Sequence, residues 1–113
     1  MNRNRRKELK YALNEMEEII DSIQHHTYGD VVDLMDLIED SKYNIEYLMD
    51  EEQDALENMP ENFQCSSRGE EMEENIMALD QASNTLCDLS NEVDPTIIVT
   101  TLQEVITTLE DLV

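Results

Sequence analysis

Apolar residues in this chain recur in steps of four and three, and this spacing constrains the fold more than any other feature of the sequence. Such steps follow one face of a helix, whereas a half-buried strand would show strict alternation. Three stripes keep this spacing: Leu9, Leu13, Met16, Ile20 and Ile23; Leu34, Ile38, Ser41, Ile45, Leu48, Glu52, Ala55 and Met59; Met72, Ile76, Leu79, Ser83, Leu86, Ser90 and Val93. The sequence therefore predicts an all-α protein, with three to four amphipathic helices in a helical bundle or a coiled-coil hairpin.

The last segment, after Asp94, allows two interpretations. Its β-branched residues favour a strand. Five apolar residues nevertheless keep the four-and-three step: Ile98, Leu102, Val105, Leu109 and Leu112. Pro95 suits the first turn of a helix that Asp94 caps. We predict a helix across residues 96–113, with a strand as the alternative.

Turn-forming residues predict where the other helices end. Gly29 ends or bends the first helix, and Asp30 is a good N-cap for the second. Pro60 stops the second helix, and residues 60–69 form the one loop. A serine at position 66 or 67 caps the helix that follows.

Charge is distributed very unevenly along the chain. There are 28 Asp and Glu residues against 7 Lys and Arg residues, which gives a formal net charge of −21. Residues 1–10 form a basic head on a single acidic helical domain that spans residues 1–113. This balance excludes a conventional nucleic-acid-binding protein, because phosphate contacts need Lys and Arg. No apolar run reaches the ~18 residues of a membrane span, so we expect no membrane contact.

The basic head carries five cations: Arg3, Arg5, Arg6, Lys7 and Lys10. At the start of a helix these cations oppose the helix dipole, so we expect them to be paired. Their partners would be acids of the same or a neighbouring chain. The functional alternative is contact with a nucleic acid that a partner holds, so direct nucleic-acid contact is expected only through residues 3–10.

Candidates for catalysis are weak. Glu15-x-x-Glu18 together with Glu51-x-x-Asp54 imitates the two acidic pairs with which helical nucleotide pyrophosphatases hold Mg²⁺. A quarter of the chain is acidic, however, so such pairs arise readily by chance, and no basic residue lies near either pair to hold phosphate. We expect no enzymatic activity, no bound metal and no cofactor.

Histidine and cysteine residues have spacings that fit no familiar site. His25 and His26 are adjacent, so they point to different helix faces, and we expect them at a helix end or on the surface. Cys65 and Cys87 lie 22 residues apart, and free thiols are the favoured interpretation.

Rows of acidic residues are the remaining signal. Between Asp30 and Glu57 a helix would carry them over about 40 Å, or one charge per ~4 Å. A DNA strand presents one charge per ~3.4 Å, so such a row could occupy a basic groove built for nucleic acid. The alternative is that the acids only keep an amphipathic helix soluble. The candidate partner-binding residues are Asp33, Asp36, Glu39, Asp40, Glu46, Asp50, Glu51, Glu52, Asp54, Glu57, Glu70, Glu71, Glu73 and Glu74.

Two of these acidic clusters should lie together. Residues 50–54 contain four acids, and residues 70–74 contain four more across the loop. Antiparallel packing about the loop would place both clusters at one end of the protein. We expect the most negative potential there.

Two segments resemble a known group of proteins. MNRNRRKELK at the start and DEEQDALENMPENFQCSSRGEEMEE at positions 50–74 are similar to small acidic helical proteins encoded by phages and prophages of Gram-positive bacteria. The resemblance covers about half the chain; residues 24–48 look like an insertion, and the tail after Pro95 departs from the pattern. It implies no catalytic residues. By analogy it suggests an inhibitor of host nucleases, of the anti-CRISPR or anti-restriction kind.

Two functions follow as hypotheses. The first is a phage-derived inhibitor that mimics DNA or RNA and occupies the basic groove of a host nuclease or DNA-binding effector in the bacterial cytoplasm. The second is a structural or adaptor coiled coil that binds a partner through an apolar helix stripe. We also expect a homodimer, because a helix of 30 residues would offer more apolar surface than one small bundle needs.

Overall fold

The four-and-three stripes fold as helices throughout. The computed structural model describes every residue from Met1 to Val113 and contains no strand, so the all-α prediction is confirmed. The elements are α1 (Arg3–Gln24), α2 (Val31–Glu57), α3 (Glu61–Gln64), α4 (Ser67–Asp88), a 3₁₀ turn η1 (Leu89–Asn91) and α5 (Pro95–Glu110). None of these helices combines the length and the apolar composition that a bilayer crossing requires.

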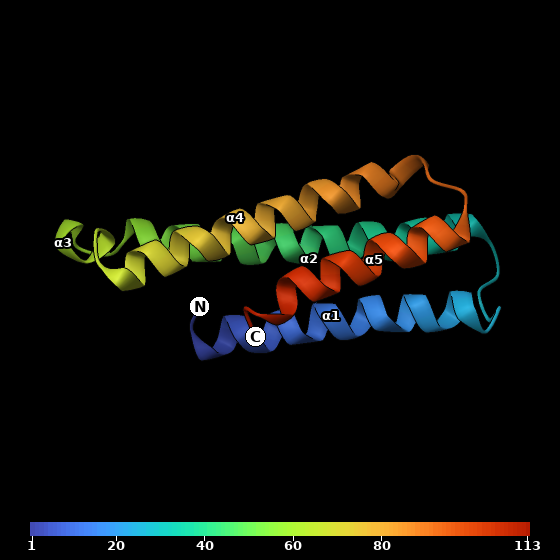
Figure 1. Cartoon of the computed structure of the whole chain (residues 1–113), viewed down its shortest axis with the longest axis horizontal. Helices are drawn as coiled ribbons and strands as arrows, with labels where there is room; N and C mark the ends of the chain where they lie inside the picture. The colour runs from blue at the N-terminus through green and yellow to red at the C-terminus, as the bar shows by residue number, and fades with distance from the viewer.

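The four long helices lie side by side, each antiparallel to the one before it (Figure 1). Neighbouring pairs are α1 with α2, α2 with α4, α4 with α5, and α5 with α1. The molecule is elongated, with principal extents of 51 × 23 × 18 Å. The α2–α4 hairpin continues past the ends of α1 and α5, so that α3 lies at the far end of the molecule (Figure 1).

The core is formed by the apolar stripes, largely as predicted. All five residues of the first stripe are buried, and the second is buried from Leu34 to Glu52. Beyond that point Leu56 takes the buried position that the spacing gave to Ala55. The third stripe is wrong at its end: Ser90 and Val93 are exposed, because α4 stops at Asp88 and the 3₁₀ turn changes the phase.

Helix ends depart from the prediction at two places. α1 ends at Gln24, and His26, not Gly29, takes the left-handed conformation, with φ 55°. Asp30 stands at the N-cap position of α2, but its side chain makes no capping hydrogen bond. The predicted turn therefore exists, although other residues form it.

The predicted loop at 60–69 is wrong in part. It contains the single turn α3, and α4 already begins at Ser67. Ser66 caps α4 by accepting a hydrogen bond from the Gly69 amide at 3.4 Å. A Cβ on Gly69 would overlap the carbonyl oxygen of Gln64, so only glycine lets α3 pack this closely on α4.

The tail is a helix, not a strand. Asp94 caps α5 by accepting a hydrogen bond from the Thr96 amide at 2.9 Å, and Pro95 occupies the first turn as predicted. One face of α5 packs into the core, including three of its β-branched residues, while Ile97 is exposed; the buried residues are Ile98, Leu102, Val105, Ile106 and Leu109. Tertiary burial outweighs β propensity here.

Candidate functional site

Most of the predicted partner-binding acids are on the surface. Eleven of the fourteen are exposed: Asp33, Asp36, Glu39, Asp40, Asp50, Asp54, Glu57, Glu70, Glu71, Glu73 and Glu74. Glu46 and Glu51 are half-buried, and Glu52 is fully buried. Glu46 faces α4, where its Oε1 accepts a hydrogen bond from Ser83 Oγ at 3.0 Å.

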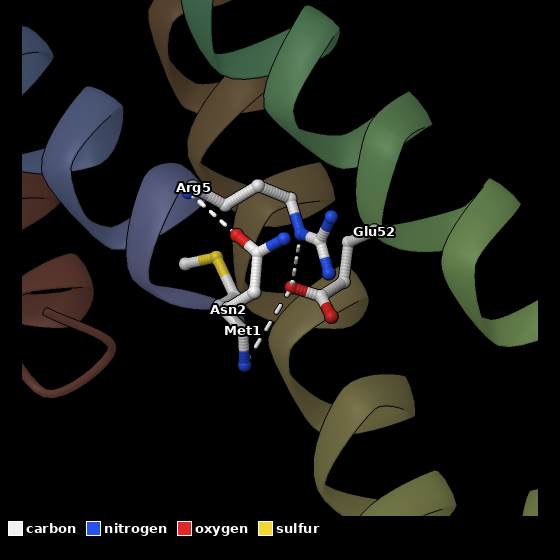
Figure 2. Close-up of polar contacts among 4 residues, drawn as sticks. All are labelled: Met1, Asn2, Arg5 and Glu52. Carbon is white, nitrogen blue, oxygen red and sulfur yellow. Dashed lines mark hydrogen bonds and ion pairs between the residues drawn. The ribbon is translucent and has the colours of Figure 1, made fainter.

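Glu52 is the one predicted site residue that the fold removes from any partner. Its Oε2 lies 3.5 Å from Nε of Arg5 and 3.7 Å from the terminal nitrogen of Met1. Figure 2 shows Arg5 reaching from α1 toward Glu52 on α2, while the Asn2 side chain caps α1 by accepting from the Arg5 amide. Glu52 therefore ties α1 to α2, which corrects its assignment as a partner-binding residue.

The acidic row along α2 is interrupted. One exposed ridge of α2 carries Asp33, Asp36 and Asp40 near its start and Asp50, Asp54 and Glu57 near its end. Tyr43 and Tyr47 occupy the ridge positions between these two groups. The acids thus form two clusters, not the continuous row that the average spacing suggested.

The larger cluster lies at the projecting end of the α2–α4 hairpin. We call residues 50–74 the acidic tip; they include the last turns of α2, the whole of α3 and the first turns of α4. Antiparallel packing of α2 and α4 brings its two acidic runs to the same end of the molecule, as predicted (Figure 1). Ten acids and one basic residue, Arg68, fall in this segment.

Few of these charges are neutralised within the chain. Glu52 is the one acidic side chain that lies within 4.0 Å of an arginine, lysine or terminal ammonium nitrogen, and Asp21 lies 3.0 Å from a ring nitrogen of His25. The exposed acids of the tip have no such partner. Because no nearby cation offsets these exposed carboxylates, the tip has a concentrated negative potential that faces solvent.

The basic head is less paired than expected. Arg5 alone among its five side chains forms an ion pair, which corrects the expectation that all of them are paired. Arg6 lines a shallow hollow at the base of the acidic tip, together with Arg68 and Glu71. The head therefore meets the acidic body only where α1 begins.

The acidic pairs that suggested magnesium binding do not assemble into a cluster. No group of three or more His, Cys, Asp or Glu side chains is close enough together to hold a metal ion. Glu15 instead accepts a hydrogen bond from Asn44 at 3.3 Å. His25 and His26 are exposed at the end of α1, and both cysteines are free and exposed, as predicted.

Three exposed tyrosines were not among the predicted site residues. Tyr11 on α1 is 68 % exposed, and Tyr43 and Tyr47 on α2 are 54 % and 62 % exposed. The hydroxyl of Tyr43 donates to Glu39 at 3.1 Å. The Glu51 carboxylate, as a hydrogen-bond acceptor and as a negative charge, raises the pKa of Tyr47. Tyr43 and Tyr47 are four residues apart and lie off the apolar stripe, and this spacing could have placed both on one exposed face of the helix.

Comparison with known proteins adds no assignment to this surface. No family model, no curated protein and no solved structure matches the chain, so its function has to be argued from the charge and the geometry of its own residues.

Proposed function

We propose that the protein is a stoichiometric inhibitor that occupies the nucleic-acid groove of a basic partner with its acidic tip. The observation that carries the proposal is the concentration of unpaired carboxylates at the projecting end of the α2–α4 hairpin. Two helices of about 10–12 Å each give the hairpin a width of about 20 Å, and the hairpin projects beyond α1 and α5 (Figure 1), so it can reach into a groove on a partner. The resemblance to small acidic phage proteins suggests a host nuclease or DNA-binding effector as the partner and the bacterial cytoplasm as the place of action.

The arrangement of helices supports this function over the adaptor alternative. An adaptor needs an apolar stripe that is free to receive a partner helix, whereas the stripes of all four long helices pack into one internal core. We propose an up-and-down helical bundle whose one protruding hairpin carries the charge. The apolar surface that motivated the predicted homodimer packs within one chain, so the dimer stays a prediction that light scattering can test and that the apolar stripes no longer support.

The partner can be identified by affinity capture from a bacterial lysate, followed by mass spectrometry. We expect a nucleic-acid-binding protein whose affinity for the chain falls at least about tenfold between about 50 and about 200 mM salt. An apolar contact would be nearly insensitive to salt over this range. Capture of partners that bind no nucleic acid would contradict the proposal.

A pair of charge-matched variants then tests the surface. The tip variant changes Asp54, Glu57, Glu70 and Glu74 to Lys, and each of these residues is exposed. The control variant makes the same change at four exposed acids elsewhere: Glu17, Asp80, Glu104 and Glu110. Four Glu or Asp to Lys changes raise the net charge by eight in both proteins, so any difference between them reflects position.

We expect the tip variant to lose binding to the captured partner and the control variant to lose much less. Competition with a DNA or RNA duplex for the partner gives a second readout, because a mimic and a nucleic acid cannot occupy one groove together. Circular dichroism of both variants establishes that they are folded. Equal losses in the two variants would show that net charge, and not the acidic tip, determines binding.

A further inference from the structure

A groove between α1 and α2 combines aromatic rings with carboxylates, away from the acidic tip. One hollow of about 620 Å³ is lined by Tyr11 and Tyr47 together with Glu8 and Glu15. A second, of about 550 Å³, continues from it past Tyr43. Glu15 and Asn44 line both hollows, and the Asn44 amide donates to Glu15 at 3.3 Å between them, so the hollows adjoin on either side of this pair; we call the two together the tyrosine groove.

The length and lining of the tyrosine groove indicate an extended ligand. It follows α1 from Asn4 to Ser22, about 27 Å at 1.5 Å per residue. Four acids line it, namely Glu8, Glu15, Glu18 and Asp40, against the single cation Lys7. Its rings and its charge together fit a cationic segment, since a cation over an aromatic face is attracted by the ring quadrupole.

One tyrosine of the groove already holds a cation. The ammonium of Lys42 lies 4.9 Å from the centre of the Tyr43 ring, within the range of a cation–π contact. No cation of the chain covers Tyr11 or Tyr47, although both rings are more than half exposed. These two rings are therefore free to receive cations from outside, and Glu8 and Glu15 beside them can accept hydrogen bonds.

We infer that the tyrosine groove binds an arginine-bearing segment of a partner protein, with guanidinium groups stacked on Tyr11 and Tyr47 and hydrogen-bonded to Glu8 and Glu15. Arginine fits better than lysine, because its planar guanidinium stacks on aromatic faces and is weakly hydrated. Tyr11 on α1 and Tyr47 on α2 line the same hollow, so two arginines of one partner segment would meet one ring from each helix. This inference concerns a second surface and does not rest on the proposed role of the acidic tip.

A second copy of the chain fits the groove less well. Each copy carries a net charge of −21, and its basic residues are concentrated in the first ten positions. Bringing two such chains together sets like charges against each other. The charge of the groove instead favours a partner with an excess of arginine.

A helical peptide of about 18 residues, with four arginines on one face, is a direct probe. Its affinity is measured by calorimetry at physiological salt, beside peptides with four lysines or four glutamines at the same positions. We expect the arginine peptide to bind most tightly and the glutamine peptide to show no binding. Equal binding of the arginine and lysine peptides would show that charge alone determines binding to the groove, and would overturn the inference.

Three variants of unchanged net charge complete the test. Tyr11→Leu with Tyr47→Leu removes both rings, and we expect about tenfold weaker binding of the arginine peptide. Tyr11→Phe with Tyr47→Phe keeps the rings and should restore most of the affinity. Phe63→Leu, which removes an exposed ring from α3, is the control and should change nothing.

Two further results would overturn the inference. Full affinity in the double leucine variant would show that the rings take no part. Self-association of the wild-type protein in sedimentation experiments, lost in the double leucine variant, would identify a second copy as the occupant. Because none of these variants alters the acidic tip, failure here leaves the proposed inhibitor function to its own test with the charge-matched variants.

Discussion

Removing the buried carboxylate of Glu52 should destabilise the protein, although the chain has a large excess of acids. Its side chain is 0 % exposed and that of Arg5 is 13 % exposed. At an effective dielectric constant of about 20, charges separated by 3.5 Å attract by about 5 kcal/mol. Withdrawing the carboxylate and its partners from water offsets much of this attraction, and none of the atoms involved makes a hydrogen bond.

Glu52→Gln leaves the Arg5 guanidinium nearly buried without a counter-charge. Losing one partner of a buried ion pair typically costs about 3–5 kcal/mol. Because Arg5 retains some contact with water and can turn further toward it, we expect about 2–3 kcal/mol in the free energy of unfolding. Urea denaturation followed by circular dichroism measures this loss.

Asp54→Asn is the matched control, because Asp54 is an exposed acid of the same helix. It removes the same charge and should leave stability unchanged or raise it slightly, since repulsion at the acidic tip decreases. The double variant Arg5→Met, Glu52→Leu removes the guanidinium together with the carboxylate and should recover part of the stability lost in Glu52→Gln, because only the Met1 ammonium then lacks its counter-charge. A Glu52→Gln protein as stable as Asp54→Asn would refute the reasoning.

Three further predictions concern separate features of the protein. Gly69→Ala should lower the free energy of unfolding by about 2 kcal/mol in urea denaturation, because the added Cβ meets the backbone of α3. In the control Gly29→Ala the added Cβ meets only the movable carboxylate of Asp33, so the free energy of unfolding should change by less than about 1 kcal/mol. In an ultraviolet titration the Tyr47 hydroxyl should ionise above its ordinary pKa of 10.0, and Glu51→Gln should lower the pKa of Tyr47. Because the folded state favours the neutral hydroxyl, Tyr47 contributes to stability below pH 10.0. This contribution is lost as the pH rises through the higher pKa of the folded state. Ser41→Ala removes a buried hydroxyl that has no hydrogen-bond partner. In urea denaturation the free energy of unfolding should therefore stay the same or rise by about 1 kcal/mol, and a clear decrease would contradict this prediction.

The helices could be predicted because their burial follows simple periodicity. Ile98 and Leu102 fall on the buried face of α5 although β-branched neighbours favour a strand. Prediction failed where the local pattern does not decide the conformation. α3 forms where Gly69 permits close packing on α4, and the 3₁₀ turn after Asp88 moves Leu89 into the core instead of Ser90. Both depend on contacts between elements, which spacing along the chain does not encode.

The candidate surface was predictable to a similar degree. An acid off the apolar stripe is exposed, which placed residues such as Asp54 and Glu74 correctly. Glu52 falls on the apolar stripe itself, and this spacing predicts that it is buried. We assigned it to the surface because it is charged. The pairing of Arg5 with Glu52 could not be predicted, because it depends on how far α2 extends along α1. Tyr47 was overlooked because composition drew attention to charge.

The acidic tip owes its position to helix packing and little of its stability to the core. Residues 50–74 contribute no side chain to the main cluster of buried apolar residues, whose nearest members are Leu48 on α2 and Leu79 on α4. We expect a segment whose buried apolar side chains are only Leu56 and Met72, and which carries ten acids, to open more easily than the rest of the protein. The Arg5–Glu52 pair lies at the base of this segment and connects α1 to α2 where the core ends. A basic partner would relieve the repulsion that weakens the tip, so the binding energy would also order the surface that makes the contact.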